Sequence, residues 1–103
     1  MDDYEQIIIL YDYYGELFND KQRQCFEEYY FNNFSLAEIA INEDKSRNAI
    51  HKIIKGVVNK LYEYENILGM YKKDVELKKI IDKVSDGKLK KELEGLLWKI
   101  NYQ

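Results

Sequence analysis

The sequence contains no proline, one cysteine and one histidine among its 103 residues. Because Cys25 stands alone, an internal disulfide is excluded. The longest uncharged apolar run, Ile7 to Tyr11, is too short to span a bilayer. Acidic residues Asp2 and Asp3 stand where a secretory signal would have basic ones. We therefore expect a protein of the cytoplasm without a membrane span.

Few residues are suited to catalysis. His51 is the only histidine, and the sequence indicates neither a Cys–His pair nor a Ser–His–Asp set around it. The sequence also lacks a glycine-rich loop for phosphate and the spacing of metal ligands. We therefore predict a protein that is not an enzyme and that holds neither a cofactor nor a metal ion.

Charge is distributed unevenly along the chain. Residues 1–44 carry eleven acidic and two basic side chains, a net charge of −9, whereas residues 45–60 carry five basic ones and no acidic one. Residues 61–103 have a net charge of +1, which gives −3 for the whole chain. A short basic segment in an acidic protein is what a local contact with phosphates requires. The alternative is a helix face that is merely solvated.

Hydrophobic residues recur every three to four positions, and no alternation of apolar and polar residues lasts long enough to indicate a strand. The predicted fold class is all-α. Capping boxes are expected at Asn19 with Gln22 and at Ser35 with Glu38, and Ser46 is expected to cap a fourth helix. About six helices follow from these patterns, over residues 3–18, 19–31, 35–41, 46–69, 71–84 and 88–102.

The fourth helix has two contrasting faces. Its apolar positions, expected in the core, are Ala49, Ile50, Ile53, Ile54, Val57, Val58 and Leu61. Its opposite face collects Arg47, Asn48, His51, Lys52, Lys55 and Asn59. Gly56 lies in mid-helix, where it marks either a close helix crossing or a kink. Cys25, in the second helix, is expected to be a small core residue.

Residues 35–55 have the build of a helix-turn-helix. Ala40 is the small residue where the helices cross, residues 42–45 form the turn, and Ile50 and Ile53 anchor the second helix. The exposed N-terminal part of that helix enters the major groove of DNA in such units. Arg47 suits guanine, Asn48 suits adenine, and the lysines suit phosphate. The predicted nucleic-acid-binding residues are Ser46, Arg47, Asn48, His51, Lys52 and Lys55.

Three stretches resemble region 4 of bacterial sigma factors, and most closely the small YlxM-like proteins. These are Leu17-Phe-Asn-Asp-Lys-Gln-Arg-Gln-Cys-Phe-Glu-Glu-Tyr-Tyr-Phe31, Phe34-Ser-Leu-Ala-Glu-Ile-Ala40 and Ser46-Arg-Asn-Ala-Ile50. The resemblance covers roughly residues 4 to 98 and includes an N-terminal helix and a charged helical tail. It implies an all-helical fold and a regulatory or accessory role in protein targeting by the signal recognition particle.

Two positions depart from the helix-turn-helix pattern. Asp44 stands where glycine is usual, and aspartate tolerates a left-handed backbone less well than glycine. Lys45 stands where an apolar residue is usual, so either its stem lies on the core or the turn is remodelled. Glu43 and Asp44 also bring negative charge close to an approaching phosphate.

Two classes of binding function stay open. One is a DNA-binding regulator that uses residues 46–61, and the other, which the resemblance favours, is an accessory protein that contacts the particle's protein, its RNA or both. We expect residues 1–103 to form a single domain, with the helix-turn-helix at 35–61 and a helical tail at 62–103. The tail carries more large apolar groups than one stripe holds, so its last helices or a second subunit must cover them; we favour a homodimer through the C-terminal helices.

Overall fold

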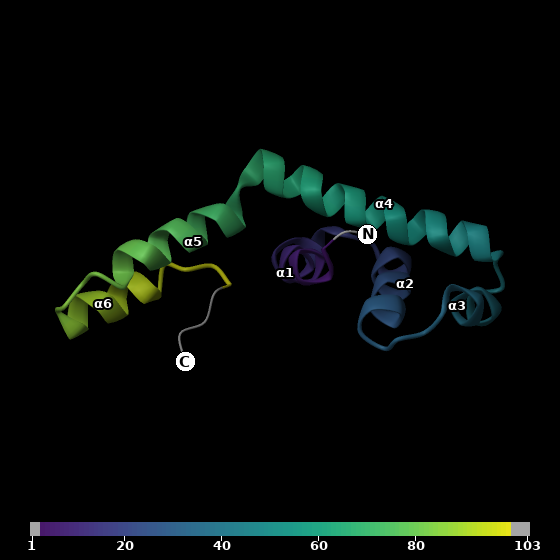
Figure 1. The fold of residues 1–103 in the computed structure, drawn as a ribbon, viewed down its shortest axis with the longest axis horizontal. Coiled ribbons are helices and arrows are strands. Elements are labelled where there is room, and N and C mark those ends of the chain that lie inside the picture. The colour runs from purple at the N-terminus through teal and green to yellow at the C-terminus, as the bar shows by residue number, and fades with distance from the viewer. Residues whose placement is uncertain (1–2, 100–103) are drawn as a thin grey trace. The chain divides into compact units, whose positions relative to one another are not determined.

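The computed structural model describes residues 3–99, and its regular elements are all helices (Figure 1). They are α1 (Tyr4–Tyr14), the 3₁₀ turn η1 (Gly15–Leu17), α2 (Asp20–Tyr30), α3 (Leu36–Glu43), α4 (Arg47–Leu68), α5 (Met70–Ile81) and α6 (Gly87–Glu94). The all-α prediction is confirmed. The chain divides into two compact units, residues 1–64 and 65–103. Each is described by itself.

The helices begin where their caps predict. Asn19 Oδ1 accepts from Gln22 N–H at 2.8 Å, and Gln22 Oε1 accepts from Asn19 N–H at 3.0 Å. Ser35 and Glu38 form the same reciprocal pair before α3. Both predicted capping boxes are therefore confirmed, and they satisfy backbone donors that the first turn of a helix leaves unpaired.

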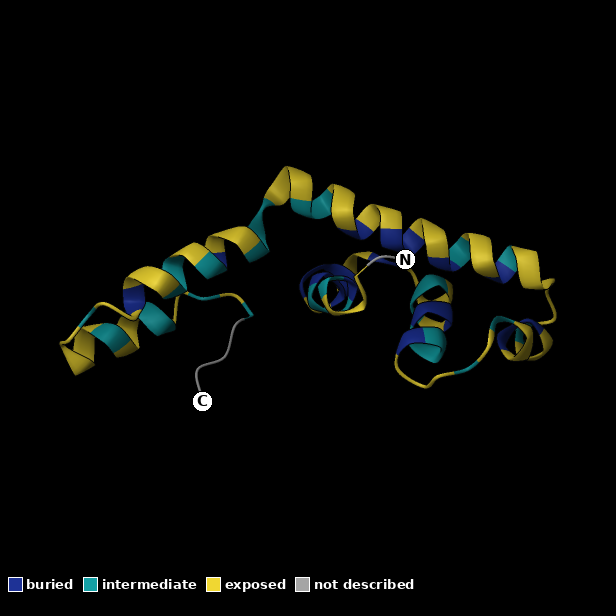
Figure 2. Ribbon diagram, in the orientation of Figure 1, coloured by how far each residue is buried: buried dark blue, intermediate teal, exposed yellow. Residues whose placement is uncertain are grey.

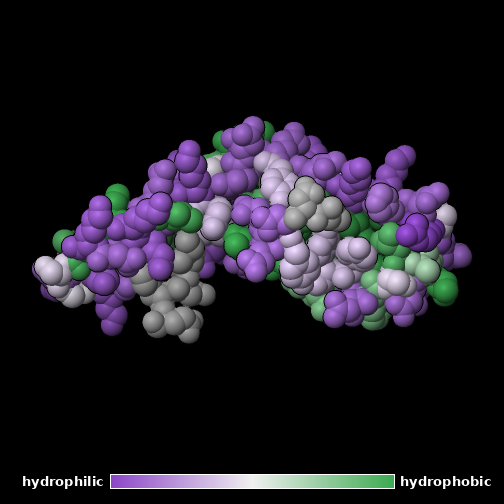
Figure 3. All heavy atoms as spheres, viewed as in Figure 1, coloured by the Kyte–Doolittle hydropathy of each residue, from purple (hydrophilic) through white to green (hydrophobic). Residues whose placement is uncertain are grey.

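The core of the first unit lies between α4 and the three helices before it. Figure 2 shows buried positions along the inner side of α4 and exposed ones along its outer side. Hydrophilic side chains cover that outer side in Figure 3. Cys25 is fully buried, as predicted for a core residue. The buried residues of α4 are Ile50, Ile54, Val57, Val58 and Leu61.

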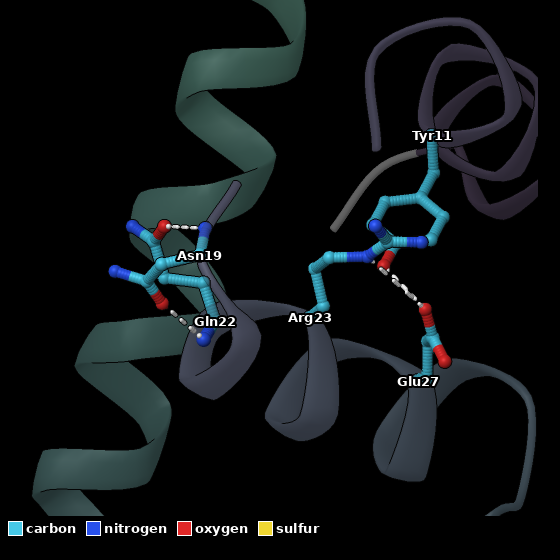
Figure 4. A network of polar contacts seen from close by, with 5 residues as sticks. All are labelled: Tyr11, Asn19, Gln22, Arg23 and Glu27. Atoms are coloured by element: carbon cyan, nitrogen blue, oxygen red, sulfur yellow. Dashed lines mark hydrogen bonds and ion pairs between the residues drawn. The ribbon is translucent and has the colours of Figure 1, made fainter. Parts of the chain in front are cut away.

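Aromatic rings supply much of this core. Tyr11 stacks on Phe26 with 4.1 Å between ring centroids, which joins α1 to α2. The Tyr11 hydroxyl donates to Glu27 Oε2 at 2.6 Å, and Arg23 lies beside the same carboxylate (Figure 4). Burial, followed by the hydrogen bond to Glu27, raises the pKa of Tyr11 to about 12. A neutral tyrosine hydroxyl thus anchors the two helices.

In the second unit, side-chain carboxylates bind backbone N–H groups that lie between 6 and 25 positions away in the sequence. Glu65 accepts from the N–H groups of Tyr71 and Lys72, at 3.1 and 3.0 Å, and so caps α5 beyond the left-handed Gly69. Asp74 is 4% exposed and accepts from the N–H groups of Trp98 and Lys99. Asp74 therefore ties the segment after α6 back to α5.

Two predicted helix ends need correction. The first helix ends at Tyr14, because Gly15 begins a 3₁₀ turn and the ring of Tyr11 lies against its backbone. The sixth ends at Glu94, well before residue 102, because the N–H groups of Trp98 and Lys99 bond to Asp74 instead of continuing the helix. The rest of that predicted helix, residues 100–102, lies outside the described residues.

Gly56 does not mark a close helix crossing. A Cβ atom added to Gly56 would meet no heavy atom within 4 Å, and α4 runs uninterrupted past it. This correction has a simple cause, since Gly56 belongs to the exposed side of α4 rather than to the buried one.

Candidate nucleic-acid interface

The turn between α3 and α4 has the hydrogen bonds of a regular helix C-terminus. Asp44 adopts the left-handed conformation, with φ 54° and ψ 48°, at the position where a helix-turn-helix usually has glycine. The Lys45 N–H donates to the Ala40 carbonyl at 2.9 Å, and the Asp44 N–H donates to the Ile41 carbonyl at 3.3 Å. This pair of bonds is the Schellman arrangement. The turn therefore keeps a regular form with Asp44 in place of glycine.

Lys45 does not enter the core. Its side chain is exposed, while Ala40, Ile39 and Ile50 are buried on either side of the turn. Ile53, the other predicted anchor, is only half-buried. The turn is thus fixed by its backbone hydrogen bonds and by these buried residues rather than by an apolar side chain at position 45.

Ser46 fixes the start of α4. Its hydroxyl oxygen accepts from the Ala49 N–H at 3.0 Å, which confirms the predicted cap. The first turn of α4 contains no acidic residue, whereas α1, α2 and α3 each contain one there. The positive end of the α4 dipole is therefore not offset by a carboxylate in its own first turn, which favours an anion at this place.

All six residues predicted to bind nucleic acid are exposed on the first three turns of α4 or at its cap. We call them the basic face; they are Ser46, Arg47, Asn48, His51, Lys52 and Lys55. Within the described part of the chain, neither Arg47, Lys52 nor Lys55 has an ion-pair partner. Their charges are therefore free to meet an external anion.

An open groove runs along α4, and five of the six residues line it; Arg47 does not. The groove is lined by Ser46, Asn48, Ala49, His51, Lys52, Lys55, Gly56 and Asn59. Ala49 and Gly56, which have a small side chain and none, lie about two helical turns apart along it. The sequence prediction of binding residues missed three of the lining residues, Ala49, Gly56 and Asn59. The signal for Asn59 was its place on the same helix face as the lysines.

Negative charge beside the turn is partly neutralised. Lys21 of α2 forms an ion pair with the Glu43 carboxylate, which is 7% exposed. The amine of Lys21 donates a hydrogen bond to Glu43, which raises the pKa of Lys21. At the C-terminal end of the basic segment 45–60, the Lys60 amine lies 3.1 Å from the Glu63 carboxylate. Lys60 therefore adds less free positive charge than the sequence suggests. The free positive charge is concentrated near the start of α4.

The described residues contain no group of three or more potential metal ligands. None of the helices within residues 3–99 has both the length and the apolar character needed to cross a membrane.

The comparisons with known proteins agree with this architecture. Residues 1–99 match the model of a family described as "Putative helix-turn-helix protein, YlxM / p13 like". UPF0122 protein TTE1463 of Caldanaerobacter subterraneus is 44% identical over 82% of this chain and 73% of its own length. UPF0122 protein MYPE4850 of Malacoplasma penetrans is 44% identical over 84% of this chain and 81% of its own length. UPF0122 protein FN1394 of Fusobacterium nucleatum is 33% identical over 94% of each chain. No solved structure matches the chain.

Proposed function

Since the chain belongs to the YlxM/p13-like family of helix-turn-helix proteins, we propose that it is a non-enzymatic regulatory protein of the cytoplasm that binds nucleic acid through the basic face of α4. The observation that carries this proposal is the exposure of Arg47, Lys52 and Lys55 without an acidic partner in the described chain. Such cations release counterions when they meet phosphates, and this release is a large part of nucleic-acid affinity.

Two further features support the proposal. The ion pair of Lys21 with Glu43 removes one of the two negative charges that the sequence places beside the turn. The regular backbone of the turn also holds α4 with its apolar side buried, so that Asn48 and His51 stay exposed beside the cations. In a helix-turn-helix these positions face the edges of the bases.

The experiment is filter binding of duplex DNA over a salt series. If Lys45, Arg47, Lys52 and Lys55 each meet a phosphate, log K falls against log[salt] with a slope of about −3.6. The triple variant with Arg47, Lys52 and Lys55 changed to alanine should lose most of the affinity and flatten the slope to about −0.9.

A matched control removes three exposed lysines elsewhere. Lys72, Lys73 and Lys79 of α5 change the net charge by the same amount when they become alanine. The control variant should bind DNA like the unaltered protein. Equal losses in both triple variants, or salt-insensitive binding, would contradict an interface on α4.

A second candidate is the accessory role in the signal recognition particle pathway that the resemblance implies. The composition of the basic face favours the accessory role in one respect. Bidentate arginine reads guanine best, and Arg47 is the only arginine of this face, so it has few groups for reading a DNA sequence. A face of lysines suits the phosphates of RNA as well as those of DNA. The same salt series with the particle's RNA separates the two candidates, because the accessory role requires RNA to remain bound where duplex DNA dissociates.

A further inference from the structure

Gly56 is a glycine in the middle of α4 that the packing of the described chain does not require. Glycine is less favourable than every residue except proline in the interior of a helix. The helix runs past Gly56 without a break, and the backbone there does not have a positive φ. A Cβ atom at this position would meet no heavy atom within 4 Å. Neither backbone geometry nor a close contact within residues 3–99 therefore accounts for glycine.

Gly56 lines the open groove on α4, and hydrogen-bond donors flank it. Lys55 precedes it, Lys52 lies about one helical turn before it, and Asn59 lies three positions after it. All four residues are exposed and line the groove. Neither lysine has an ion-pair partner within residues 3–99. The bare backbone at Gly56 is thus surrounded by groups that donate to anions.

The lining of the groove fits a sugar–phosphate backbone better than a helix of another protein. A protein helix that packs here needs apolar surface to cover at the centre of the contact. Among the described residues that line the groove, none is acidic and none has a large apolar side chain. A sugar–phosphate backbone instead needs cations and amide donors, and the groove provides both.

The position of Gly56 along α4 fits the edge of a DNA groove. Gly56 lies nine positions after Arg47, a rise of about 14 Å along the helix axis. The major groove of DNA is about 12 Å wide and about 8.5 Å deep, and a helix-turn-helix places the N-terminal residues of its second helix on the base edges. When Arg47 and Asn48 reach the bases, Gly56 is therefore at the rim of the groove, where the phosphates of one strand lie.

We propose that one strand of duplex DNA crosses α4 at Gly56, with its sugar–phosphate backbone against the bare backbone of the helix. Lys52, Lys55 and Asn59 donate to the phosphates on either side of the crossing. The inference rests on the proposed function and adds a positioning residue to it. Gly56 reads no base, but it sets how closely the strand approaches α4 and therefore how far the first turns of α4 enter the groove.

The first test follows the amide resonances of the isotopically labelled full chain during titration with a DNA duplex of about two helical turns. Saturable shifts are expected at Gly56 and Asn59 as well as in the first two turns of α4. Shifts that end at Lys52 would overturn the inference, because the strand would then leave α4 before it reaches Gly56.

Gly56→Ala is the sharpest variant, because its methyl group stands where the strand crosses while alanine favours the helix. The variant should raise the thermal midpoint by about 4 °C and yet bind duplex DNA about tenfold more weakly in filter binding. Gly56→Leu, which has a larger side chain and a similar helix propensity, should bind more weakly still. A purely structural role of Gly56 would not separate stability from binding in this way.

Two controls separate the added side chain from the stabilised helix. Gly87→Ala adds the same methyl group in α6, where a Cβ atom also meets no heavy atom within 4 Å. Asn66→Ala places alanine at an exposed position of α4 outside the groove and raises helix propensity there. Both variants should bind duplex DNA like the unaltered protein.

Unchanged affinity of Gly56→Ala, or an equal loss in either control, would contradict the crossing. If the triple alanine variant of the basic face loses DNA while Gly56→Ala retains it, the proposed function stands and only this inference fails. If the unaltered protein does not bind duplex DNA, the proposed function fails and the inference fails with it. A loss by Gly56→Ala that affects the particle's RNA but not duplex DNA would also overturn the inference, because an RNA strand would then occupy the groove.

Discussion

At the scale of single residues, the two acidic side chains next to the turn differ in their consequences for binding. Glu43 is paired with Lys21, so its charge is compensated inside the protein. Asp44 is exposed, and the turn requires its left-handed backbone conformation. Aspartate enters that conformation more readily than most residues other than glycine and asparagine. The turn therefore retains one uncompensated negative charge beside the basic face, which weakens attraction to phosphates without blocking it.

Tyr11 and Tyr30 lead to a prediction about pH. The pKa of each is raised to about 12, with burial as the first cause, whereas an unfolded tyrosine titrates near 10. Above pH 10 the unfolded chain loses these protons first. The stability that the two neutral hydroxyl groups contribute is therefore complete below pH 10 and is lost as the pH rises towards 12, by up to about 1.4 kcal/mol per pH unit for each tyrosine.

Urea unfolding at several pH values between 9 and 12 measures this loss. Lysines titrate in the same range, so the informative quantity is the difference between the unaltered protein and Tyr11→Phe. The variant should lose about 1 kcal/mol at pH 8, because the hydrogen bond to Glu27 is gone. Its free energy of unfolding should then fall less steeply above pH 10. Parallel curves for the two proteins would contradict the raised pKa of Tyr11.

The sequence predicted the helix caps correctly, because residues close together along the chain determine their hydrogen bonds. The two capping boxes and the cap at Ser46 all depend on residues within a few positions of one another. The ion pair of Lys21 with Glu43 joins residues 22 positions apart, and the hydrogen bond from the Tyr4 hydroxyl to the Tyr30 carbonyl joins residues 26 positions apart. No spacing rule connects such residues, so these features required the fold.

At the scale of helices, α6 shows how a long-range contact overrides a regular pattern. Leucines recur through residues 89–97 with helical spacing, and this pattern predicted a helix that continues to residue 102. Leu96 and Leu97 instead make short-range turns to Leu93 and Glu94, and Asp74 takes the next two N–H groups. Hydrogen bonds from backbone N–H groups to a buried, charged carboxylate are strong. They can therefore replace the helical hydrogen bonds of a last turn, which are the weakest in a helix.

Asp74→Ala tests this explanation. Alanine is a good helix former, so α5 should persist, while the N–H groups of Trp98 and Lys99 lose their acceptor. We expect a loss of about 1 to 3 kcal/mol in the stability of the segment after α6. Trp98 is the only tryptophan, so its fluorescence should move to longer wavelength, and amide exchange at Trp98 and Lys99 should accelerate.

Asp82→Ala is the control for that experiment, because Asp82 is an exposed acid next to the end of α5 that accepts none of these bonds. It should leave the fluorescence of Trp98 unchanged. An Asp74→Ala protein whose tryptophan emission and amide exchange match those of the control would show that the segment is held by other contacts.

At the scale of the whole molecule, the burial of apolar side chains differs sharply between the two units. Of the seventeen buried hydrophobic residues in the described chain, sixteen lie in the first unit and only Ile81 lies in the second. A unit with so little core is marginal by itself. Its exposed large apolar residues are Ile67, Leu68, Ile80, Leu89, Leu96 and Trp98. Exposed apolar groups that form one continuous patch are typical of a surface that another chain covers.

We therefore propose that residues 1–103 fold as one domain whose tail, residues 62–103, is completed by a homodimer. Unfolding should then occur in a single transition whose midpoint rises with protein concentration, since association stabilises only the folded state. Sedimentation at micromolar concentration should give twice the 12.4 kDa of one chain.

Leu89→Glu combined with Leu96→Glu should shift the protein to the monomer, because each buries a charge in the interface. Leu17→Glu, a change at an exposed leucine of the first unit, should leave the dimer intact. A 12.4 kDa species at every concentration would mean that the exposed residues of the tail serve no self-association.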